Sequence, residues 1–386
     1  MILSNIILCS LMGFVIFFFV LAMENFSIYG ILYAAFLMYL YCRMVFVKRE
    51  KKSKYRRIFQ AVFAVLFCIT FIADLYAERG SMAITDSAMS NAELPFCHIA
   101  IPQVIIPFLL THNIVFPARI MNHYAAVGSM IVIWLMVTLI VGRGWCSWIC
   151  FYGGWEEGFS SIGKKRKINL LSKNKELREF QIGFFVFIVL ASLCELSCIY
   201  CEWFCPFKLV TEYSPMNSIP GLIAGVLFIG LFLGLVVILP VLTKRRTQCG
   251  ILCPFGAFAS LTDKVSMFRI NIDTEKCKGC MKCAMTCKFG AIDIKTIQDK
   301  KGRPEFNCAK CGDCIGVCPE GAISFGLRDQ KKNGCHCTKK PGKIRAVVDG
   351  ICNPEQLFRF AAYSFGVVMS SGFATRALEK IAGAIF

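Results

Sequence analysis

Long apolar runs without charged residues alternate along this chain with short runs that are rich in lysine and arginine. A helix needs about 20 predominantly apolar residues to cross the hydrocarbon core of a bilayer. The pattern therefore predicts an all-α membrane bundle of about six transmembrane helices over most of the chain. The runs that fit this description are residues 1–23, 25–42, 58–73, 124–142, 180–201 and 213–243.

The basic runs predict how these helices are oriented. Residues 48–57, residues 164–167 and the pair Arg245 and Arg246 follow the second, fourth and sixth predicted spans. If six spans alternate in direction, all three runs and the N-terminus lie on one side of the membrane. Loops enriched in lysine and arginine stay in the cytoplasm. The sequence thus predicts a multi-pass protein of the cytoplasmic membrane, with the segment after residue 246 on the inner side.

Two further apolar stretches do not fit a full span. Residues 99–118 carry three prolines, and a span there would break the alternation, so we interpret them as a re-entrant or outer-surface hairpin. An outer loop packed on the surface is the alternative interpretation. Residues 356–386 are apolar but partly basic, which is typical of an interfacial helix.

The composition agrees with a membrane protein. Of the 386 residues, 56% are hydrophobic, against about 45–50% in soluble domains. The net charge of +18 does not indicate nucleic-acid binding, because the basic residues cluster beside apolar spans, as topology signals do. None of the four histidines lies in the middle of a predicted span, and the chain has no C-x-x-C-H motif, so we expect no haem.

The most specific chemical signal is a cysteine repeat, in which C-x2-C-x2-C-x3-C occurs twice. This is the ligand pattern of a two-cluster ferredoxin, where the first three cysteines of one motif share a 4Fe-4S cluster with the fourth cysteine of the other. Zinc ribbons use C-x2-C pairs that lie far apart instead. We therefore expect residues 268–327 to form a small α+β two-cluster ferredoxin-like domain. The expected ligand sets are Cys277, Cys280, Cys283 and Cys318 for one cluster, and Cys308, Cys311, Cys314 and Cys287 for the other.

The residues that follow the two fourth cysteines differ. Pro319 follows Cys318, as in the bacterial ferredoxin motif, whereas Lys288 stands in the corresponding place after Cys287. Positive charge beside a cluster raises its potential, although the sequence does not predict a value.

Cysteine pairs with C-x3-C spacing occur in the membrane part as well. Cys146 and Cys150 follow the fourth predicted span, and Cys249 and Cys253 follow the sixth, both on the predicted inner side. Cysteines four apart lie on one face of a helix, so two facing helix ends can supply four thiolates. We predict that these four cysteines hold a third cluster at the cytoplasmic surface of the membrane. Buried free cysteines are the alternative.

A longer cysteine run follows the fifth predicted span. Cys194, Cys198, Cys201 and Cys205 form C-x3-C-x2-C-x3-C, and Pro206 comes next. The alternating topology places this run at the outer end of the span, where a fourth cluster would complete an electron path between the two faces. Zinc and disulfides in an oxidising exterior are alternatives, as is a run that folds back toward the inside.

Weaker signals involve isolated residues. Cys97 and His98 are expected on the outer side, as an extra ligand pair or as the lining of a substrate site; a purely structural role is the alternative. A further metal site on the inner side is suggested by three cysteines, Cys335, Cys337 and Cys352.

The expected organisation follows from these assignments. The chain divides into N-terminal transmembrane helices at 1–78, a membrane core with the C-x3-C motifs at 79–267, the ferredoxin domain at 268–327 and a C-terminal tail at 328–386.

Multi-spanning helices, C-x3-C-P motifs and a C-terminal two-cluster ferredoxin domain resemble the membrane polyferredoxins, a group that includes NapH, the C-terminal half of NosR, and CcoG. The resemblance covers residues 120–325 and includes Cys249 to Pro254, which match C-x3-C-P. Phe151 takes the place of proline after Cys150, and the run from Cys194 to Cys205 goes beyond the family's two-motif pattern. The resemblance implies electron transfer between a membrane or cytoplasmic donor and a partner protein, often with quinol or copper nearby.

Three functional hypotheses follow. In the first, the chain is an integral membrane iron–sulfur protein that relays single electrons between a cytoplasmic or quinol donor and a membrane or extracytoplasmic partner, without catalysing bond-breaking itself. In the second, it is an enzyme, a quinol dehydrogenase or a copper-reducing metal reductase, with Cys97, His98 and residues 99–118 as the substrate site. In the third, it is a redox sensor that regulates a membrane complex.

Overall fold

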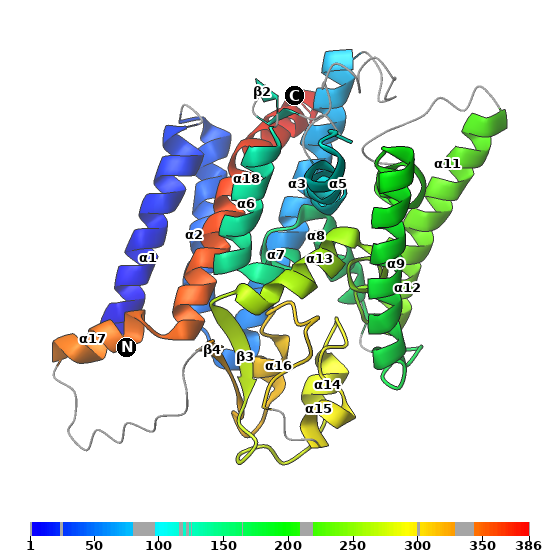
Figure 1. The fold of residues 1–386 in the computed structure, drawn as a ribbon. Coiled ribbons are helices and arrows are strands. Elements are labelled where there is room, and N and C mark those ends of the chain that lie inside the picture. The colour runs from blue at the N-terminus through cyan, green and yellow to red at the C-terminus, as the bar shows by residue number, and fades with distance from the viewer. Residues whose placement is uncertain are drawn as a thin grey trace.

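The computed structural model describes residues 2–23, 26–79, 97–115, 119–120, 123–124, 126–163, 165–208, 219–298, 302–328 and 343–385. Long helices form a bundle that carries a small domain at one end (Figure 1). In the described part of the chain, six helical segments are long and apolar enough to cross a membrane. They are α1 (Ile2–Ile16) with η1 (Phe17–Ala22), α2 (Ile28–Phe46), η2 (Arg49–Lys51) with α3 (Lys52–Arg79), α9 (Asn174–Glu195), α11 (Ile219–Leu231) with η6 (Phe232–Ile238) and α12 (Leu239–Thr243), and α18 (Pro354–Ile385).

Five of the expected spans correspond to these long helices, but the one expected at 124–142 differs. There α6 (Val127–Ile140) is short, and the chain bends by 100° into the segment Gly142–Trp148. Gly142 has φ +56°, a conformation that favours glycine, and a Cβ atom there would overlap the Asp263 carboxylate. The bend leaves Arg143 and Cys146 buried inside the bundle.

The C-terminal tail is a long helix inside the bundle, so the expectation of an interfacial helix is wrong for α18. Figure 1 shows α18 running between α2 and α6, and its C-terminal end lies opposite the small domain. The Tyr363 hydroxyl donates to the Leu37 carbonyl over 2.9 Å, and Thr70 of α3 donates to the Phe373 carbonyl over 2.6 Å. One face of α18 thus packs against α2 and α3. The partly basic composition of the tail did not indicate this buried face.

The proline-bearing stretch after residue 97 is buried and does not form a full span. η3 (His98–Ala100) leads into α5 (Ile101–Thr111), whose residues 101–105 and Pro107 are buried. Two short antiparallel strands, β1 (Arg119–Ile120) and β2 (His123–Tyr124), follow. The expectation that this segment does not form a full span is confirmed, and its two interpretations, a re-entrant hairpin and a surface-packed loop, both stay predictions.

The small domain is built on one antiparallel strand pair. β3 (Phe268–Ile272) pairs with β4 (Ile323–Leu327), with Phe268 opposite Leu327 and Ile272 opposite Ile323. The cysteine motifs and three short helices, α14 (Lys282–Thr286), α15 (Ile294–Gln298) and α16 (Asp313–Val317), lie between the strands in sequence. The pair brings the two ends of the domain together, so the two motifs come into contact through α14 and α16.

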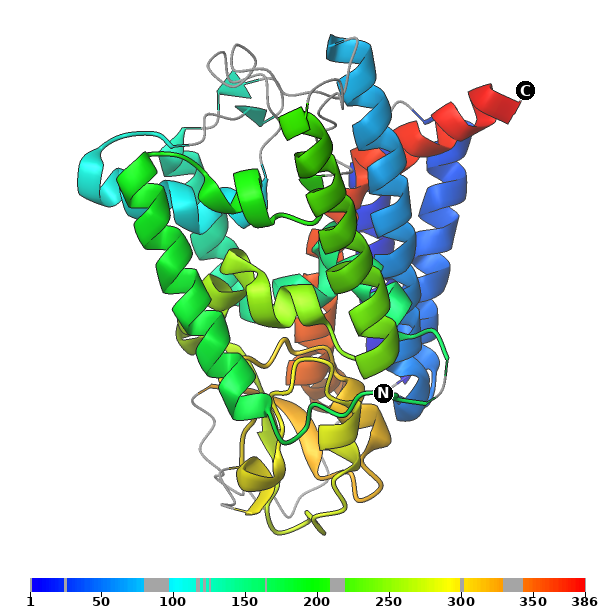
Figure 2. The same cartoon turned by 90° about the vertical axis from the view of Figure 1, so that its right-hand side faces the viewer.

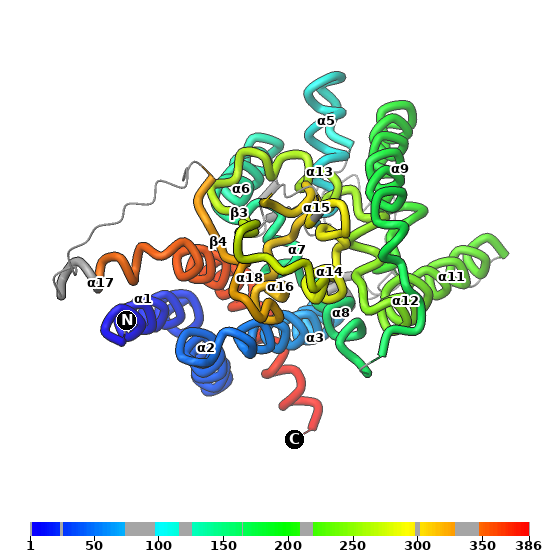
Figure 3. Tube along the Cα trace, turned by 90° about the horizontal axis from the view of Figure 1, so that it is seen from below, coloured from blue at the N-terminus to red at the C-terminus, as the bar shows by residue number. Residues whose placement is uncertain are grey.

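Short helices connect the bundle to the small domain. Seen from the side of the domain, the long helices stand around it, with α1, α2 and α18 on one side and α9 and α11 on the other (Figure 3). The connecting elements are η4 (Gly142–Gly144), α7 (Trp145–Trp148), α8 (Phe151–Ser160), η5 (Tyr200–Phe204), η7 (Gln248–Leu252), α13 (Pro254–Thr262), η8 (Asp263–Val265) and α17 (Lys343–Ile351).

The three basic runs share the end of the bundle that carries the small domain. Arg49 donates to the Ile323 carbonyl, Arg166 donates to the Met285 carbonyl, and the Arg246 amide donates to the Lys288 carbonyl over 3.1 Å. The N-terminus also lies at this end, as the view in Figure 2 shows. This arrangement agrees with the alternation expected from the sequence.

Candidate iron–sulfur sites

The first candidate site, called the distal ferredoxin site, lies within the small domain and includes an exposed cysteine. One cavity there is lined by Cys277, Cys280, Cys283 and Cys318, together with apolar neighbours that include Ile272 and Met281. These are the four cysteines that the crossed ferredoxin pattern assigns to one cluster. Cys280 is exposed, so this site is open to a partner in solution.

The second candidate site, the proximal ferredoxin site, consists of Cys308, Cys311, Cys314 and Cys287. The Cys314 thiol interacts electrostatically with the other three thiols. Burial raises the pKa of Cys308 to about 12. Iron is bound by thiolates, and burial takes away the water that would stabilise their negative charge. The positive charge of a bound cluster's iron would therefore have to stabilise the thiolates instead.

The proximal ferredoxin site faces the bundle. Ser147 donates to the Ala309 carbonyl over 2.5 Å, and the Trp148 indole donates to the Lys310 carbonyl over 3.1 Å. Two consecutive residues of the Cys308–Cys311 loop are therefore held by α7, next to Cys146.

A shared backbone conformation links the ferredoxin motifs to those in the bundle. Each C-x3-C unit ends on a cysteine with φ between −64° and −76° and ψ between 110° and 117°. The first cysteine of each unit lies in a helical turn that ends at the second. These five cysteines are Cys150, Cys205, Cys253, Cys287 and Cys318.

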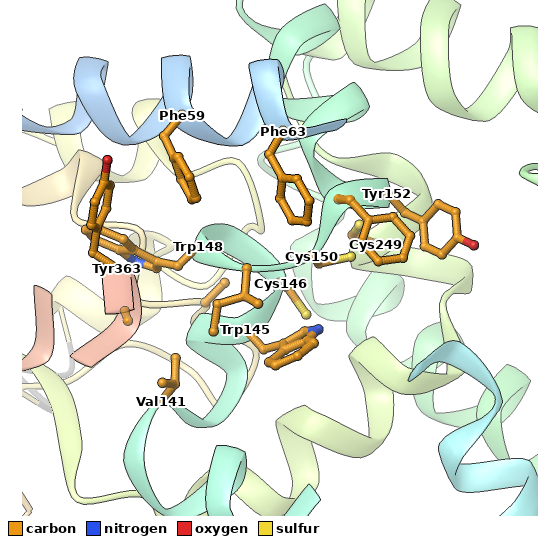
Figure 4. Packing of buried hydrophobic residues seen from close by; sticks show 14 of the residues in the cluster. Phe59, Phe63, Val141, Trp145, Cys146, Trp148, Cys150, Tyr152, Cys249 and Tyr363 are labelled. Carbon is orange, nitrogen blue, oxygen red and sulfur yellow. The ribbon is translucent and has the colours of Figure 1, made fainter. Parts of the chain in front are cut away.

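The third candidate site, the membrane site, brings Cys146, Cys150, Cys249 and Cys253 together. Cys150 interacts electrostatically with Cys146 and Cys253, and Cys249 with Cys150 and Cys253. Figure 4 shows Cys146, Cys150 and Cys249 among aromatic side chains that include Trp145 and Tyr152. All four thiols are buried, so the residues fit a group that takes four thiolates in a dry pocket.

The second cysteine of each pair caps the helix that follows it. The Cys150 sulfur accepts from the Gly153 amide of α8 over 3.3 Å, and the Cys253 sulfur accepts from the Gly256 amide of α13 over 3.4 Å. A helix N-terminus stabilises negative charge, so both caps favour the thiolate that binds iron.

A glycine three residues after each second cysteine belongs to the same motif. A Cβ at Gly153 would lie 2.7 Å from the Cys146 carbonyl oxygen, and one at Gly256 would lie 2.6 Å from the Cys249 carbonyl oxygen. The carbonyls also accept from long helices, that of Cys146 from Gln60 of α3 and that of Cys249 from Gln181 of α9. Sequence reasoning missed these residues, although the repeated glycine in C-x3-C-x2-G was a usable signal.

His98 contacts the membrane site directly. Its Nε2 atom lies 3.2 Å from the Cys150 sulfur, and its ring packs edge-on against Trp145 and Phe255. The side chain is only 6% exposed. His98 is thus placed as a hydrogen-bond partner of a candidate ligand and not as a surface residue on the outer side.

A buried charge cluster joins the bundle to the ferredoxin domain. Glu157 of α8 pairs with Arg56 of α3 and with Lys288, both over 2.9 Å, and with Arg246. Arg56 also contacts Asp313 of the ferredoxin domain over 3.3 Å. Burial on its own would raise the pKa of Glu157, but Arg246, Arg56 and Lys288 hold that pKa well below its ordinary value. Lys288, the departure from the ferredoxin pattern, is explained by this ion pair.

A layer of two arginines and one ring separates the proximal ferredoxin site from the membrane site. The guanidinium carbons of Arg143 and Arg246 lie 5.4 Å and 5.2 Å from the centroid of Phe289. Arg143 interacts electrostatically with Cys146 and Cys249 of the membrane site and with Cys308 of the proximal site. The two sites therefore share one positively charged neighbour.

The remaining cysteine run is only partly brought together. α9 ends at Glu195, and the chain then turns back into the bundle, where the Tyr200 amide donates to Gln103 of α5 over 3.0 Å. The sulfur atoms of Cys198 and Cys201 lie 3.3 Å apart, whereas Cys194 is exposed. Because α9 is long and apolar enough to cross a membrane, the alternative in which the fifth span does not cross is not supported, and residues 198–205 turn from its end into the bundle.

The further metal site expected on the inner side falls mostly outside the described residues. Cys335 and Cys337 lie outside the described residues, and Cys352 is exposed at the end of α17. Within the described ranges, no group of three or more His, Cys, Asp or Glu side chains is arranged to hold a single metal ion. A 4Fe-4S cluster takes its thiolates on separate iron atoms, so this finding concerns single-ion sites.

Two protein families match the chain. One, described as a 4Fe-4S dicluster domain, matches residues 276–322. The other, described as a 4Fe-4S binding domain, matches residues 122–169, 180–215 and 225–272, and each of these three segments contains at least one of the C-x3-C motifs of the bundle.

Relatives with similar sequences have names that refer to electron transport or ferredoxins. The putative electron transport protein YccM of Escherichia coli is 24% identical over 220 residues, which cover 54% of this chain and 58% of YccM. The methylamine utilization ferredoxin-type protein MauN of Methylobacillus flagellatus is 26% identical over 230 residues, 59% of this chain and 65% of MauN. The chain thus spans less than two thirds of either relative.

A small ferredoxin matches a short part of the chain. This uncharacterised ferredoxin of Methanocaldococcus jannaschii is 36% identical over 56 residues, which are 14% of this chain and 89% of the ferredoxin. No solved structure matches the chain. The narrower resemblance to NapH, NosR and CcoG stays a prediction. Through its residues 276–322 the chain belongs to the 4Fe-4S ferredoxin-type proteins, and it is an electron-transport iron–sulfur protein with membrane-spanning helices.

Proposed function

We propose that this chain relays single electrons between a redox partner on the cytoplasmic side and a partner reached through the membrane bundle. The 4Fe-4S clusters, when bound, would supply the one-electron chemistry. The distal and proximal ferredoxin sites would each hold one cluster, and the membrane site would hold a third. The protein's own residues hold these groups, exclude water from them and set their charge environment.

The single observation that carries this proposal is the continuity between the proximal ferredoxin site and the membrane site. Arg143 interacts with thiols of both sites, and Phe289 packs between Arg143 and Arg246. Ser147 and Trp148 donate hydrogen bonds to the Cys308–Cys311 loop, and these bonds keep the distance between the two sites fixed. A fixed, dry, positively charged junction suits electron transfer better than two sites that move independently.

The basic runs support one orientation of the protein in the membrane. They share one end of the bundle with the ferredoxin domain, and lysine- and arginine-rich segments stay in the cytoplasm. We therefore place the ferredoxin domain in the cytoplasm, where the exposed Cys280 edge of the distal site would meet a soluble or membrane-bound partner.

The enzyme hypothesis has less support than the relay. It required Cys97, His98 and the adjoining hairpin to line a substrate site. His98 instead contacts Cys150 and four aromatic rings at 6% exposure, and the first half of α5 is buried. This placement favours a role in tuning the membrane site.

The relay is tested by following electrons into the membrane site. Anaerobically prepared protein in liposomes is mixed with a reduced soluble ferredoxin, which does not cross membranes, and frozen at intervals for EPR. We expect the signals of the ferredoxin domain to appear first and that of the membrane site to follow. In Cys146→Ser, where the membrane site lacks a ligand, the second signal should be missing, while Cys68→Ala, a buried cysteine outside these three sites, should match the wild type. A membrane-site signal that never appears in wild type with this donor would contradict the relay.

A further inference from the structure

We propose that Cys97, and not Cys194, completes a fourth 4Fe-4S site with Cys198, Cys201 and Cys205, which we call the outer site. The inference rests on the proposed function in one respect, the identity of the bound group. It changes the ligand set that the sequence run alone suggests, because it takes one ligand from a segment about 100 residues earlier in the chain.

The spacing of the run itself indicates a missing ligand. Cys198, Cys201 and Cys205 form C-x2-C-x3-C, which is the ferredoxin motif without its first cysteine, and Pro206 follows as in that motif. Cys194 precedes Cys198 by four positions instead of three. The last cysteine, Cys205, has the same backbone conformation as Cys253 and Cys318.

The local structure excludes Cys194 from this group. It lies in the last turn of α9, one residue before the helix ends at Glu195, and its side chain is exposed. Leu196 then adopts a left-handed conformation with φ +47°, which turns the chain back into the bundle. Cys198 and Cys205 are by contrast 1% and 9% exposed. The helix end and the turn at Leu196 thus separate Cys194 from the three cysteines that enter the bundle.

Cys97 lies close to the cysteine run. Its thiol interacts electrostatically with Cys201, and its sulfur lies 3.9 Å from the Tyr152 hydroxyl oxygen. Tyr152 in turn interacts electrostatically with Cys205. Cys97 and Cys205 thus both lie near Tyr152, and Cys201 lies near Cys97.

The segment that carries Cys97 is fixed against the cysteine run. Gln103 of α5 accepts from the Tyr200 amide over 3.0 Å and from the Ser192 hydroxyl over 3.1 Å. Ala100 and Val104, which flank this contact, pack with Cys198 and Cys201 in one buried cluster. The segment after residue 97 therefore cannot move away from the run without breaking contacts on both sides.

The outer site would extend the path of the relay. Cys253 of the membrane site interacts electrostatically with Cys205, and Tyr200 interacts with both of these thiols. His98, the neighbour of Cys97 in sequence, contacts Cys150. One short segment, residues 97–98, would thus serve two adjacent sites, with a ligand to the outer one and a hydrogen bond to the membrane one.

The test compares iron content among single serine variants of the full chain, purified without oxygen. We expect Cys97→Ser and Cys198→Ser each to lose about four iron atoms, and the double variant to lose no more than either alone. Cys194→Ser should keep the full complement. The EPR signals of the two ferredoxin clusters, which form in a separate domain, show in each variant that the protein has folded. Iron lost from Cys194→Ser but retained in Cys97→Ser would overturn the assignment.

Alkylation supplies a second readout that needs no variant. In iron-loaded protein we expect iodoacetamide to modify Cys194 and to leave Cys97 unmodified until a chelator removes the iron. Cys97 that reacts equally before and after chelation would overturn the proposal, as would a disulfide between Cys198 and Cys201 in the oxygen-free protein. These failures differ from a failure of the relay, because a wild type that holds iron at the ferredoxin and membrane sites would still support electron transfer.

Discussion

The imidazole Nε2 atom of His98 lies 3.2 Å from the sulfur of Cys150. A hydrogen bond to a ligand sulfur stabilises the extra negative charge of a reduced cluster, so it raises the reduction potential. Replacement of His98 with phenylalanine keeps an aromatic ring among Trp145 and Phe255 but removes the bond. We expect the potential of the membrane site to fall on the order of 40 mV, which corresponds to a bond of about 1 kcal/mol.

An EPR-monitored redox titration measures this shift. His112→Ala is the matched control, because His112 is exposed at the end of α5. A potential that does not change in His98→Phe would show that the contact has no part in tuning the site.

Glu157 is expected to hold the ferredoxin domain onto the bundle. Glu157→Gln leaves Arg56, Arg246 and Lys288 buried without their shared carboxylate. Removal of one partner from a buried ion cluster costs about 3–5 kcal/mol, so thermal unfolding should start at a clearly lower temperature. Glu179→Gln breaks an exposed pair with Lys175 and should change little. Equal loss in both variants would contradict a special role for the buried cluster.

The same carboxylate predicts a dependence on pH. The three cations hold the pKa of Glu157 well below the ordinary value of 4.5 in the folded protein. A depressed folded pKa stabilises the protein fully above the ordinary value, and this contribution is lost as the pH falls through the folded pKa. The advantage of wild type over Glu157→Gln should therefore be constant from pH 6 to 8, roughly, and shrink only in strong acid. Unfolding measured across this range checks the expectation, and a difference that vanishes near neutral pH would refute it.

Gly256 is expected to be essential for the membrane site. A methyl group at this position would lie 2.6 Å from the Cys249 carbonyl oxygen, so Gly256→Ala should displace the C-x3-C turn. We expect the loss of about four iron atoms, with the ferredoxin signals retained. Gly250→Ala is the control, since a Cβ there meets no atom within 4 Å. Full iron content in Gly256→Ala would mean that the turn adapts and that the glycine is dispensable.

The topology of α18 predicts where the C-terminus lies. α18 is long enough to cross the membrane, and its end is opposite the ferredoxin domain (Figure 1). A green fluorescent protein fused after Arg328 should fluoresce, because that position is in the cytoplasm in the proposed orientation. The same protein fused after residue 386 should be dark, and an alkaline phosphatase fused there should be active. Fluorescence from both fusions would restore the interfacial-helix interpretation.

The ferredoxin domain could be predicted from sequence because its ligands are local. Eight cysteines in two short motifs specify both the domain and the crossed assignment, and the structure places Cys318 in one cavity with the first three cysteines of the other motif. The C-x3-C pairs were recognisable for the same reason. Their grouping into one site also followed, since both pairs end on the same side of the predicted bundle.

Contacts between distant segments could not be predicted in this way. The sequence near His98 does not indicate that this residue contacts Cys150. Lys288 is a departure from the ferredoxin motif in the sequence, and only the structure shows its ion pair with Glu157. The bend at Gly142 and the burial of α18 both depend on tertiary packing, whereas apolar length alone predicts a straight span and a partly basic tail alone predicts the interface. Hydropathy therefore gave the number of long helices approximately and assigned two of the segments wrongly.

The most direct test of the central claim is the iron content of anaerobically purified protein, combined with EPR of its fully reduced state. The account predicts at least about twelve iron atoms per chain, and ferredoxin signals broadened by a neighbouring spin in the membrane site. That broadening should disappear in the double variant Cys146→Ser with Cys249→Ser. About eight iron atoms in wild type, with ferredoxin spectra identical in the double variant, would contradict a cluster in the membrane part and the relay built on it.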